Sequence, residues 1–348
     1  GAVPFAGAFE TGDFNLMMYS VENRSAEPLD ELSEEKNNAV LKALSKDMKQ
    51  RFASCGDLIA ALSGETSAVN QLTHNQTLTP KTSIKTVKCL KCGICIECCP
   101  SCILSMGEDG PTCEFDRGCM ACGHCVAICP VGALENKYTP LEKQRPITKP
   151  MLDEETAYEF MRMRRSVRNF KPAVPSEEEL TKLLNITRYA PTAGNSQGMY
   201  YVVIRDQERI KAIADAVADW MEEEIAAGSA NKRYFMTVLR AYRDRGQDII
   251  ARKAPCLVFA LARRLNNTGV SNAEQCWAYA ELFAPTIGLG TTIAGFIQEC
   301  GIAGYQPLID LLEELPPKHK IVGCLMVGYP KYKFRRMPER QHLKVEFK

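Results

Sequence analysis

From Met151 onward, hydrophobic positions follow helical and strand patterns in turn. After Asp206, apolar side chains recur every three or four residues, as on one face of a helix, at Ile210, Ile213, Val217 and Trp220. Short, continuously apolar runs predict buried strands at residues 200–205, 256–262 and 321–327. This mixture predicts an α+β domain over residues 151–348.

Two sequences of the capping-box type predict where helices of this domain begin. Ser176 to Glu179 precede a periodic apolar segment, and Ala190-Pro191 ends the predicted helix. Ser271 to Glu274 predict the start of another helix, which Pro285 should end or kink. Four cysteines of this domain lie in apolar stretches of the sequence and are predicted to be core residues: Cys256, Cys276, Cys300 and Cys324.

Residues 1–85 form a predicted N-terminal extension that is partly helical. Apolar positions with helical spacing run from Leu32 to Phe52, a second short helix is predicted at residues 57–62, and the polar stretch 63–83 is predicted to be a linker. The extension carries no catalytic constellation, so we interpret it as a docking arm for a possible partner. A proline-containing linker is predicted at residues 137–150.

Charge and hydropathy exclude several classes of protein. The 348 residues carry a formal net charge of +1, so no global basic field attracts nucleic acid or anionic lipid. The longest apolar run, Ala254 to Ala262, is far shorter than the roughly 20 residues of a membrane span. We therefore expect a soluble protein without a transmembrane segment.

Cysteine is the unusual residue, because eleven of the sixteen cysteines lie between Cys89 and Cys129. Within this block, one pattern, C-x2-C-x2-C-x3-C-P, occurs twice at an offset of thirty residues. Its cysteines are Cys89, Cys92, Cys95 and Cys99 in the first copy, and Cys119, Cys122, Cys125 and Cys129 in the second. This is the spacing of bacterial two-cluster ferredoxins.

The spacing predicts two [4Fe-4S] clusters in residues 86–136. Three closely spaced thiolates let one loop hold three corners of a cluster, and the fourth cysteine of each motif reaches the other cluster. Cluster one is therefore assigned to the first three cysteines of copy one and Cys129, and cluster two to the first three of copy two and Cys99. Gly93 and Gly123 permit the tight turn in each loop.

Two alternative interpretations of the cysteine block fit the sequence less well. Cys92, Cys95, Cys98 and Cys102 fit the same spacing, but that register lacks the proline and puts Gly93 out of step with Gly123. Zinc sites use two cysteine pairs rather than two such quartets. The leftover Cys98, Cys102 and Cys113 are interpreted as small buried residues, and His124 as a structural loop residue. Free thiols in this number indicate a reducing compartment, cytoplasmic or organellar.

Three segments of the larger domain carry candidate chemistry. Arg164 to Arg168 end a predicted helix, and an arginine fork with a serine hydroxyl suits a phosphate monoester. A polar loop runs from Ala190 to Gln197. The glycines from Gly288 to Gly295 are similar to a dinucleotide-binding fingerprint. The third glycine is out of position and no strand is predicted before the segment, so a Rossmann site is rejected.

Together and in this order, these segments resemble the nitroreductase family of FMN-dependent oxidoreductases. The resemblance runs from about Met161 to Arg340 and includes Val327 to Pro330, followed by Arg335, Arg336 and Arg340. With the cysteine block in front, the chain resembles ferredoxin-type nitroreductases of anaerobes. Residues 1–85 lie outside the resemblance.

The resemblance implies a homodimer of nitroreductase-like α+β fold with FMN at the subunit interface. Arg164, Arg165, Ser166 and Arg168 would lie at the FMN phosphate with Arg336 or Arg340, the partner subunit would contribute Pro191, Thr192, Ala193 and Asn195, and Ala294 and Gly295 would approach the flavin N5 edge. The chain departs from many relatives at Ala294, where a glutamate or bulkier residue is usual, and at Gly198, where proline is usual. Both departures concern the substrate pocket.

The combination predicts an electron-transferring oxidoreductase without a side-chain nucleophile. Clusters pass single electrons, whereas FMN stores two and releases them as hydride. Expected acceptors are nitroaromatics, quinones or activated alkenes, and the donor is reduced ferredoxin or NAD(P)H. The alternative is a non-catalytic electron-transfer or structural subunit of a larger complex, which the long N-terminal extension motivates.

Overall fold

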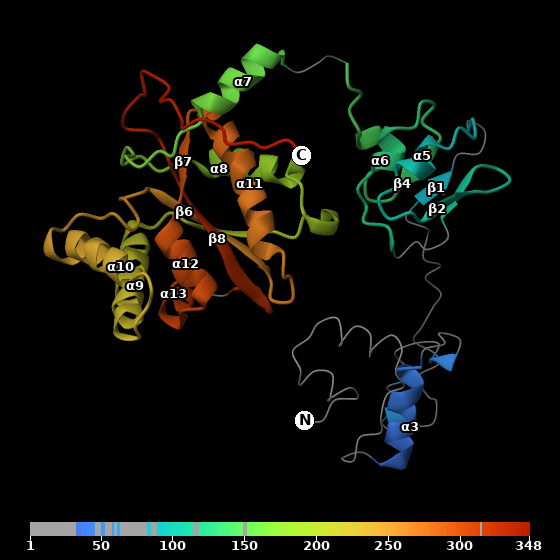
Figure 1. Ribbon diagram of the computed structural model, residues 1–348, viewed down its shortest axis with the longest axis horizontal. Coiled ribbons are helices and arrows are strands. Elements are labelled where there is room, and N and C mark those ends of the chain that lie inside the picture. Colours follow the sequence, from blue (N-terminus) through green and yellow to red (C-terminus); the bar gives the residue numbers. More distant parts are fainter. Residues whose placement is uncertain are drawn as a thin grey trace. The chain divides into compact units, whose positions relative to one another are not determined.

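A computed structural model describes residues 33–45, 50–52, 58, 61–62, 82–84, 89–113, 118–148, 152–313 and 315–348. The chain divides into two units, residues 1–79 and 80–348. In the first, helix α3 (Glu34–Ala43) begins at Ser33, whose hydroxyl accepts the backbone N–H of Lys36 (Figure 1). Of the predicted helix at 57–62, the structure describes only residues 58, 61 and 62, and all three are helical. Nearly all of the predicted linker 63–83 lies outside the described residues.

The cysteine block consists of very short elements. Strand β1 (Thr82–Ile84) pairs antiparallel with β4 (Leu134–Asn136), and β2 (Leu104–Met106) pairs with β3 (Pro111–Cys113). The four-residue helices α5 (Ile94–Glu97) and α6 (His124–Ala127) each follow a left-handed glycine, Gly93 and Gly123. Because β1 pairs with β4, residues 82–84 belong to this block and not to the predicted linker. The predicted linker 137–150 contains the 3-10 turn η4 (Leu141–Lys143).

The larger domain is built on a four-stranded antiparallel sheet in the order β5-β6-β8-β7. The strands are β5 (Tyr200–Ile204), β6 (Cys256–Arg263), β7 (Gly290–Ile293) and β8 (His319–Gly328). Along β6, Leu257, Phe259 and Leu261 enter one hydrophobic cluster, whereas Val258 and Ala260 enter another. Both faces of the strand are therefore covered, which explains its continuously apolar sequence.

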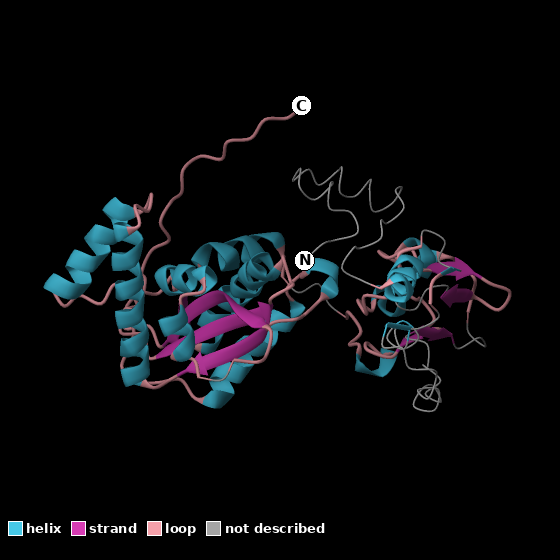
Figure 2. Ribbon diagram, turned by 90° about the horizontal axis from the view of Figure 1, so that it is seen from below, coloured by secondary structure: helices cyan, strands magenta, loops and turns pink. Residues whose placement is uncertain are grey.

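Helices cover both faces of this sheet (Figures 1 and 2). On one face, a hydrophobic cluster is formed between the sheet and helices α9 (Gln207–Ala226), α10 (Lys232–Leu239), α12 (Gly295–Ala303) and α13 (Gln306–Asp310). On the other face, a second cluster is formed between the sheet and helices α8 (Glu177–Asn185) and α11 (Gly269–Phe283). Helix α7 (Glu154–Met163) precedes the domain. The short helical turns are η5 (Ile186–Tyr189), η6 (Ala193–Asn195), the π-turn η7 (Arg240–Asp244) and η8 (Ala284–Ile287).

Most predicted elements are confirmed, and two details are wrong. The Ser176 capping box is present and opens α8, and the four apolar-context cysteines are buried. However, α11 begins at Gly269 after Thr268, so Ser271 lies inside the helix rather than at its start. The fourth strand, β7, was not predicted, because four residues of Gly-Thr-Thr-Ile give too short a pattern. No helix in the described part of the chain is long and apolar enough to cross a membrane.

Candidate cysteine cavities and flavin site

Two small cavities in the cysteine block are each lined by four motif cysteines. The first contains Cys89, Cys92, Cys95 and Cys129. The second contains Cys99, Cys119, Cys122 and Cys125. The fourth cysteine of each motif thus lies in the cavity of the other motif, as the predicted ferredoxin register requires. The rival register requires Cys98 and Cys102, and neither lines these cavities.

The two loops share one backbone geometry. Lys91 and Gly93 have φ of 52° and 79°, and Ala121 and Gly123 have φ of 54° and 74°. A β-carbon at Gly123 would lie 2.7 Å from Thr139 Oγ1, so glycine is required there for close packing as well as for the turn. The repeat in the sequence is therefore also a repeat in structure.

Several donors point at the cysteine sulfurs. The backbone N–H of Lys91 donates to Cys89 Sγ at 3.4 Å, and that of Ala133 donates to Cys129 Sγ at 3.2 Å. The buried side chain of Asn136 donates to Cys119 Sγ at 3.7 Å. Hydrogen bonds to sulfur stabilise thiolates and tune the potential of a bound cluster. Asn136 is a supporting residue that the sequence analysis did not identify.

Burial disfavours ionisation of cysteine thiols in this block. Desolvation, followed by nearby Cys122, raises the pKa of Cys125 to about 11, and desolvation also raises the pKa of Cys95. Cysteine binds metal as thiolate, so ligation at these positions has to release protons. In the residues that the structure describes, no three His, Cys, Asp or Glu side chains converge closely enough to hold a single metal ion.

The leftover residues of the block have separate positions. Cys98 is half-buried and donates to the carbonyl of Cys95 at 3.4 Å, and Cys113 ends β3. Cys102 is exposed and has a φ of 49°. The interpretation of Cys102 as a small buried residue is therefore wrong. His124 is exposed at the first position of α6.

The arginine segment of the larger domain is extended rather than helical. Helix α7 ends at Met163, and the N–H of Val167 donates to Thr291 O at 2.8 Å, beside an isolated bridge between Ser166 and Thr291. The prediction that Arg164 to Arg168 end a helix, where Arg164 and Arg168 would lie one turn apart, is therefore wrong. In an extended chain alternate residues share a side, which still groups Arg164 with Ser166 and Arg168. Arg164 Nη1 donates to Ser166 Oγ at 3.5 Å.

Two charged residues beside this segment were missed by the sequence analysis. Glu281 of α11 lies 3.5 Å from Arg164, and burial raises the pKa of its carboxyl group. Arg252 is half-buried, and burial together with the charge of Arg168 lowers the pKa of its guanidinium. Arg252 and Lys253 have φ of 55° and 49° in a loop whose N–H groups bind the carboxylate of Asp248. The charges of Arg168 and Arg252 act on each other, and the carboxylates of Glu281 and Asp248 act on Arg168 and Arg252 respectively.

The loop from Pro191 to Gln197 is shaped by a buried asparagine. Asn272 Oδ1 accepts the N–H of Ala193 at 3.0 Å, and Asn272 Nδ2 donates to Ser196 Oγ at 3.3 Å. Thr192 Oγ1 accepts the N–H of Gln197 at 3.1 Å. Asn195, with a φ of 51°, donates from Nδ2 to the carbonyls of Met120 and Ala121, both at 3.0 Å. The amide of Asn195 therefore contacts the loop between Cys119 and Cys122.

The remaining predicted flavin residues lie at the end of β7 and in the C-terminal segment. Ala294 is fully buried and donates its N–H to Cys324 O at 2.9 Å, whereas a β-carbon at Gly295 would meet open space. The open backbone at Gly295 fits the approach of a flat ring. Arg336 and Arg340 are exposed in the segment that follows β8.

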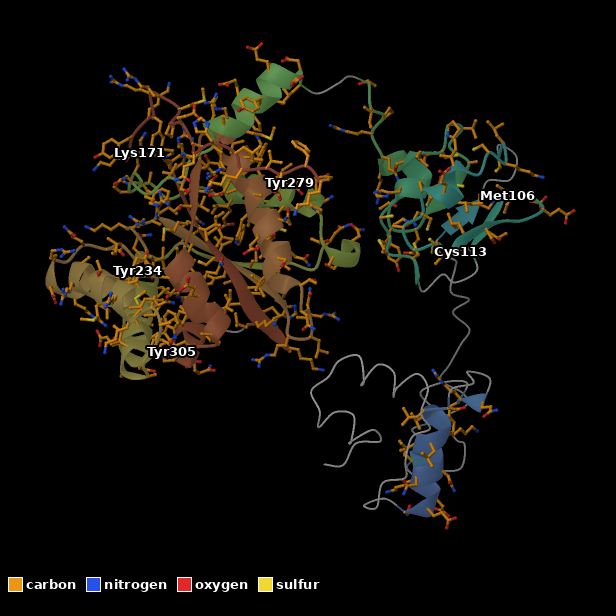
Figure 3. All side chains as sticks on the ribbon, viewed as in Figure 1. Met106, Cys113, Lys171, Tyr234, Tyr279 and Tyr305 are labelled. Atoms are coloured by element: carbon orange, nitrogen blue, oxygen red, sulfur yellow. The ribbon has the colours of Figure 1, made fainter. Side chains whose placement is uncertain are left out.

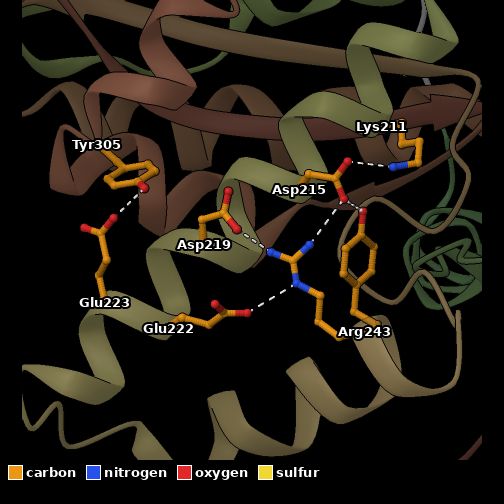
Figure 4. Close-up of polar contacts among 8 residues, drawn as sticks. Lys211, Asp215, Asp219, Glu222, Glu223, Arg243 and Tyr305 are labelled. Carbon is orange, nitrogen blue, oxygen red and sulfur yellow. Dashed lines mark hydrogen bonds and ion pairs between the residues drawn. The ribbon is translucent and has the colours of Figure 1, made fainter.

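A separate charged network connects α9 to the π-turn after α10 (Figure 4). Arg243 pairs with Glu222 at 3.3 Å, with Asp215 at 3.6 Å and also with Asp219. Lys211 pairs with Asp215 at 2.6 Å, and the Tyr242 hydroxyl donates to Asp215 at 2.8 Å. The positive and negative groups satisfy each other, so we interpret this network as structural.

The comparisons with known proteins concern the larger domain. Residues 161–329 match the Nitroreductase family. This matched segment contains the arginine segment, the polar loop and strand β7, so the larger domain has a nitroreductase-like α+β fold. Among curated proteins, one from Archaeoglobus fulgidus, named for NADH dehydrogenase and NAD(P)H nitroreductase activity, is 38% identical over 53 residues, which are 15% of this chain and 30% of that relative.

Solved structures include two nitroreductases with bound FMN. The protein from Bacteroides fragilis is 18% identical, with a TM-score of 0.43, and the match covers 56% of this chain and 100% of that one. The protein from Desulfitobacterium hafniense is 17% identical, with a TM-score of 0.45 and the same two coverages.

Proposed function

We propose that this protein is an iron–sulfur flavoprotein oxidoreductase that passes electrons through two [4Fe-4S] clusters and FMN to a flat electrophile. The observation that carries the proposal is the pair of cavities, each lined by four cysteines drawn from both motifs. A flavin-binding domain of the nitroreductase type on the same chain gives these clusters an acceptor. Nitroaromatics, quinones and activated alkenes are the acceptor classes we propose.

The residues present fit both kinds of cofactor. Four thiols per cavity and donors from Lys91, Ala133 and Asn136 suit an iron–sulfur cluster. Arg164, Ser166 and Arg168 suit the phosphate of FMN, and no dinucleotide fingerprint is present in the sequence to bind the second half of FAD. When bound, FMN accepts single electrons and delivers a hydride; the chain's own part is to position the ring and to balance charge.

The described side chains beside the proposed flavin site would balance the charge of the bound cofactor. Arg168 and Arg252 place two positive groups beside one another, which favours an added negative charge. Glu281 pairs with Arg164 at 3.5 Å. The contact between Asn195 and the carbonyls of Met120 and Ala121 supports delivery of electrons from the Cys119 loop toward the flavin domain.

The test of this proposal is anaerobic purification followed by analysis of iron, sulfide and flavin. We expect about eight irons and eight sulfides per chain, following the two-cluster rule, together with FMN rather than FAD. Reduced ferredoxin and NADPH are then compared as donors, with nitroaromatic and quinone acceptors. Zinc in place of iron would contradict the cluster assignment. Bound FMN without turnover of any acceptor would favour the non-catalytic alternative.

We also propose that the protein acts as a homodimer whose flavin site uses both subunits. A ligand that contacts both chains stabilises the assembled state, so removal of FMN should loosen the dimer. Light scattering with and without flavin measures this directly. A monomer that keeps full FMN occupancy at nanomolar concentration would contradict the proposal.

A further inference from the structure

The larger domain has a cavity with a volume of about 540 Å³ that shares one residue, Arg165, with the proposed flavin residues. It is bounded by the extended segment after α7, by the turn from η8 into β7, and by the segment after β8. Of the proposed flavin residues, only Arg165 lines it, because Arg165 and Val167 face away from Arg164, Ser166 and Arg168 in the extended chain. Its volume falls within the roughly 300–1,000 Å³ of small-molecule sites.

Backbone hydrogen bonds hold the walls of this cavity together. The N–H of Lys171 donates to Tyr329 O at 2.8 Å, and the N–H of Lys331 donates to Asn169 O at 2.9 Å. A β-carbon at Gly290 would lie 2.6 Å from Val167 Cγ2, so only glycine lets these two walls approach. The Tyr329 hydroxyl donates to Glu179 at 2.7 Å, which fixes its ring. The cavity is therefore defined by the fold.

The cavity is positively charged. Arg165, Lys171, Lys331 and Lys333 line it, against a single carboxylate from Glu281. All three lysines are exposed, and none forms an ion pair within the part of the chain that the structure describes; Figure 3 labels Lys171. Glu281 already pairs with Arg164. An excess of cations around a cavity favours an anionic ligand.

The remaining walls are flat and apolar. Pro285, Leu289 and Pro330 line the cavity together with the rings of Tyr329, Tyr332 and Phe334. The Arg165 guanidinium lies 5.9 Å from the centre of the Phe334 ring. Aromatic faces and a stacked guanidinium suit a planar ligand.

Two polar atoms of the lining residues are buried without a partner. Arg165 Nε is an unused donor, and Glu281 Oε1 is an unused acceptor. Buried polar groups are normally hydrogen-bonded. An anionic oxygen of a ligand could accept a hydrogen bond from Arg165 Nε, and an N–H group of the same ligand could donate to Glu281 Oε1. Both contacts need only small movements of side chains in the cavity wall.

We propose that this cavity binds a flat organic anion, with its ring against the aromatic wall and its anionic group at the lysines. A cavity of similar volume beside α9 supports no such proposal, because Lys211, Asp215 and Arg243 in its wall already form ion pairs with one another. The inference does not depend on the chemistry of the proposed flavin site.

The test uses the full-length protein as purified, with its flavin content measured first, and three probes. Adenosine 5′-monophosphate supplies a flat ring and an anion, adenosine supplies only the ring, and inorganic phosphate supplies only the charge. Calorimetry should show binding of the nucleotide at least about tenfold tighter than either part, since stacking and charge act together. Nucleotide binding that is no tighter than phosphate binding would overturn the proposal.

Variants in which a lysine is replaced by glutamate test where the nucleotide binds. Lys171→Glu and Lys331→Glu should each weaken nucleotide binding by at least about tenfold, whereas the exposed control Lys182→Glu should not change it. Flavin absorbance and iron content should stay constant in all three variants. Equal affinity in every variant, or release of flavin by the nucleotide, would place the ligand elsewhere. If the reversals instead change the oligomeric state, a second copy of the chain covers the cavity and the proposal is wrong.

Discussion

The cysteine block and the larger domain obtain their order in different ways. The strands of the cysteine block have three residues each, and among its described residues the buried cluster comprises Cys95, Leu104, Cys125, Val126 and Leu134. The larger domain contains the ten-residue strand β8 and two extensive buried clusters on the faces of one sheet. Below about 70 to 80 residues a single core seldom gives enough stability without metals, disulfides or similar support. We infer that ligation organises the block and that burial organises the larger domain.

Removal of iron should therefore have the largest and most local effect. Chelation under reducing conditions should unfold residues 82–148, because metal-binding free energy is folding free energy in such a domain. The sheet of the larger domain should keep its fold. Hydrogen exchange resolved by peptide measures both regions in one sample. Persistent protection of the cysteine block after complete iron loss would show that its small core is sufficient.

Substitution of single cysteines tests which of them hold the proposed clusters in the cysteine block. Cys99 lines the second cavity, whereas Cys98 lines neither cavity and donates to a backbone carbonyl. Cys99→Ser should lose one cluster, about four irons per chain, while Cys98→Ser should keep both. Iron analysis and electron paramagnetic resonance of the reduced protein provide the measurement. The opposite result would establish the rival register.

The two regions also differ in what their sequences predict. The spacing of cysteine, glycine and proline predicted the two groups of four cysteines that line the two cavities, because this spacing is local in the sequence. Their ligation of clusters stays a prediction. Burial periodicity predicted β5, β6 and β8, but it missed β7, whose edge position depends on pairing with β8. Glu281 and Arg252 were missed because tertiary packing alone brings them to Arg164 and Arg168. Their isolated positions in the sequence carry no signal.

An arginine exchange in the larger domain should affect one cofactor only. Arg168→Ala should weaken FMN binding by roughly 2 kcal/mol, the scale of a charge-assisted hydrogen bond. Iron content should not change, because the proposed cluster ligands all lie in the cysteine block. Fluorescence titration of flavin into flavin-free protein measures the affinity, with Arg188→Ala as a control on the exposed turn η5. Equal losses in both variants would indicate a nonspecific charge effect.

The smallest expected effect concerns the start of α8. Ser176 Oγ accepts the N–H of Glu179, and the Glu179 carboxylate accepts both the Ser176 N–H and the Tyr329 hydroxyl. Ser176→Ala should destabilise the larger domain by about 1 kcal/mol, the usual cost of losing a helix cap. Thermal unfolding followed by near-ultraviolet circular dichroism should detect the change, and the iron content should remain constant.

Acid provides a second test of the same cap. The hydrogen bonds from Ser176 and Tyr329 lower the pKa of Glu179 below its ordinary value. A carboxyl group whose pKa is lower in the folded state stabilises the fold above the unfolded pKa, about 4.3, and loses that contribution as the pH falls through the folded pKa. The difference in melting temperature between wild type and Glu179→Gln should therefore shrink as the pH falls from 7 toward 3. Because burial rather than ligation organises this domain, the change should occur equally in iron-free protein, and a difference that appears only with iron bound would show that the two regions are not independent.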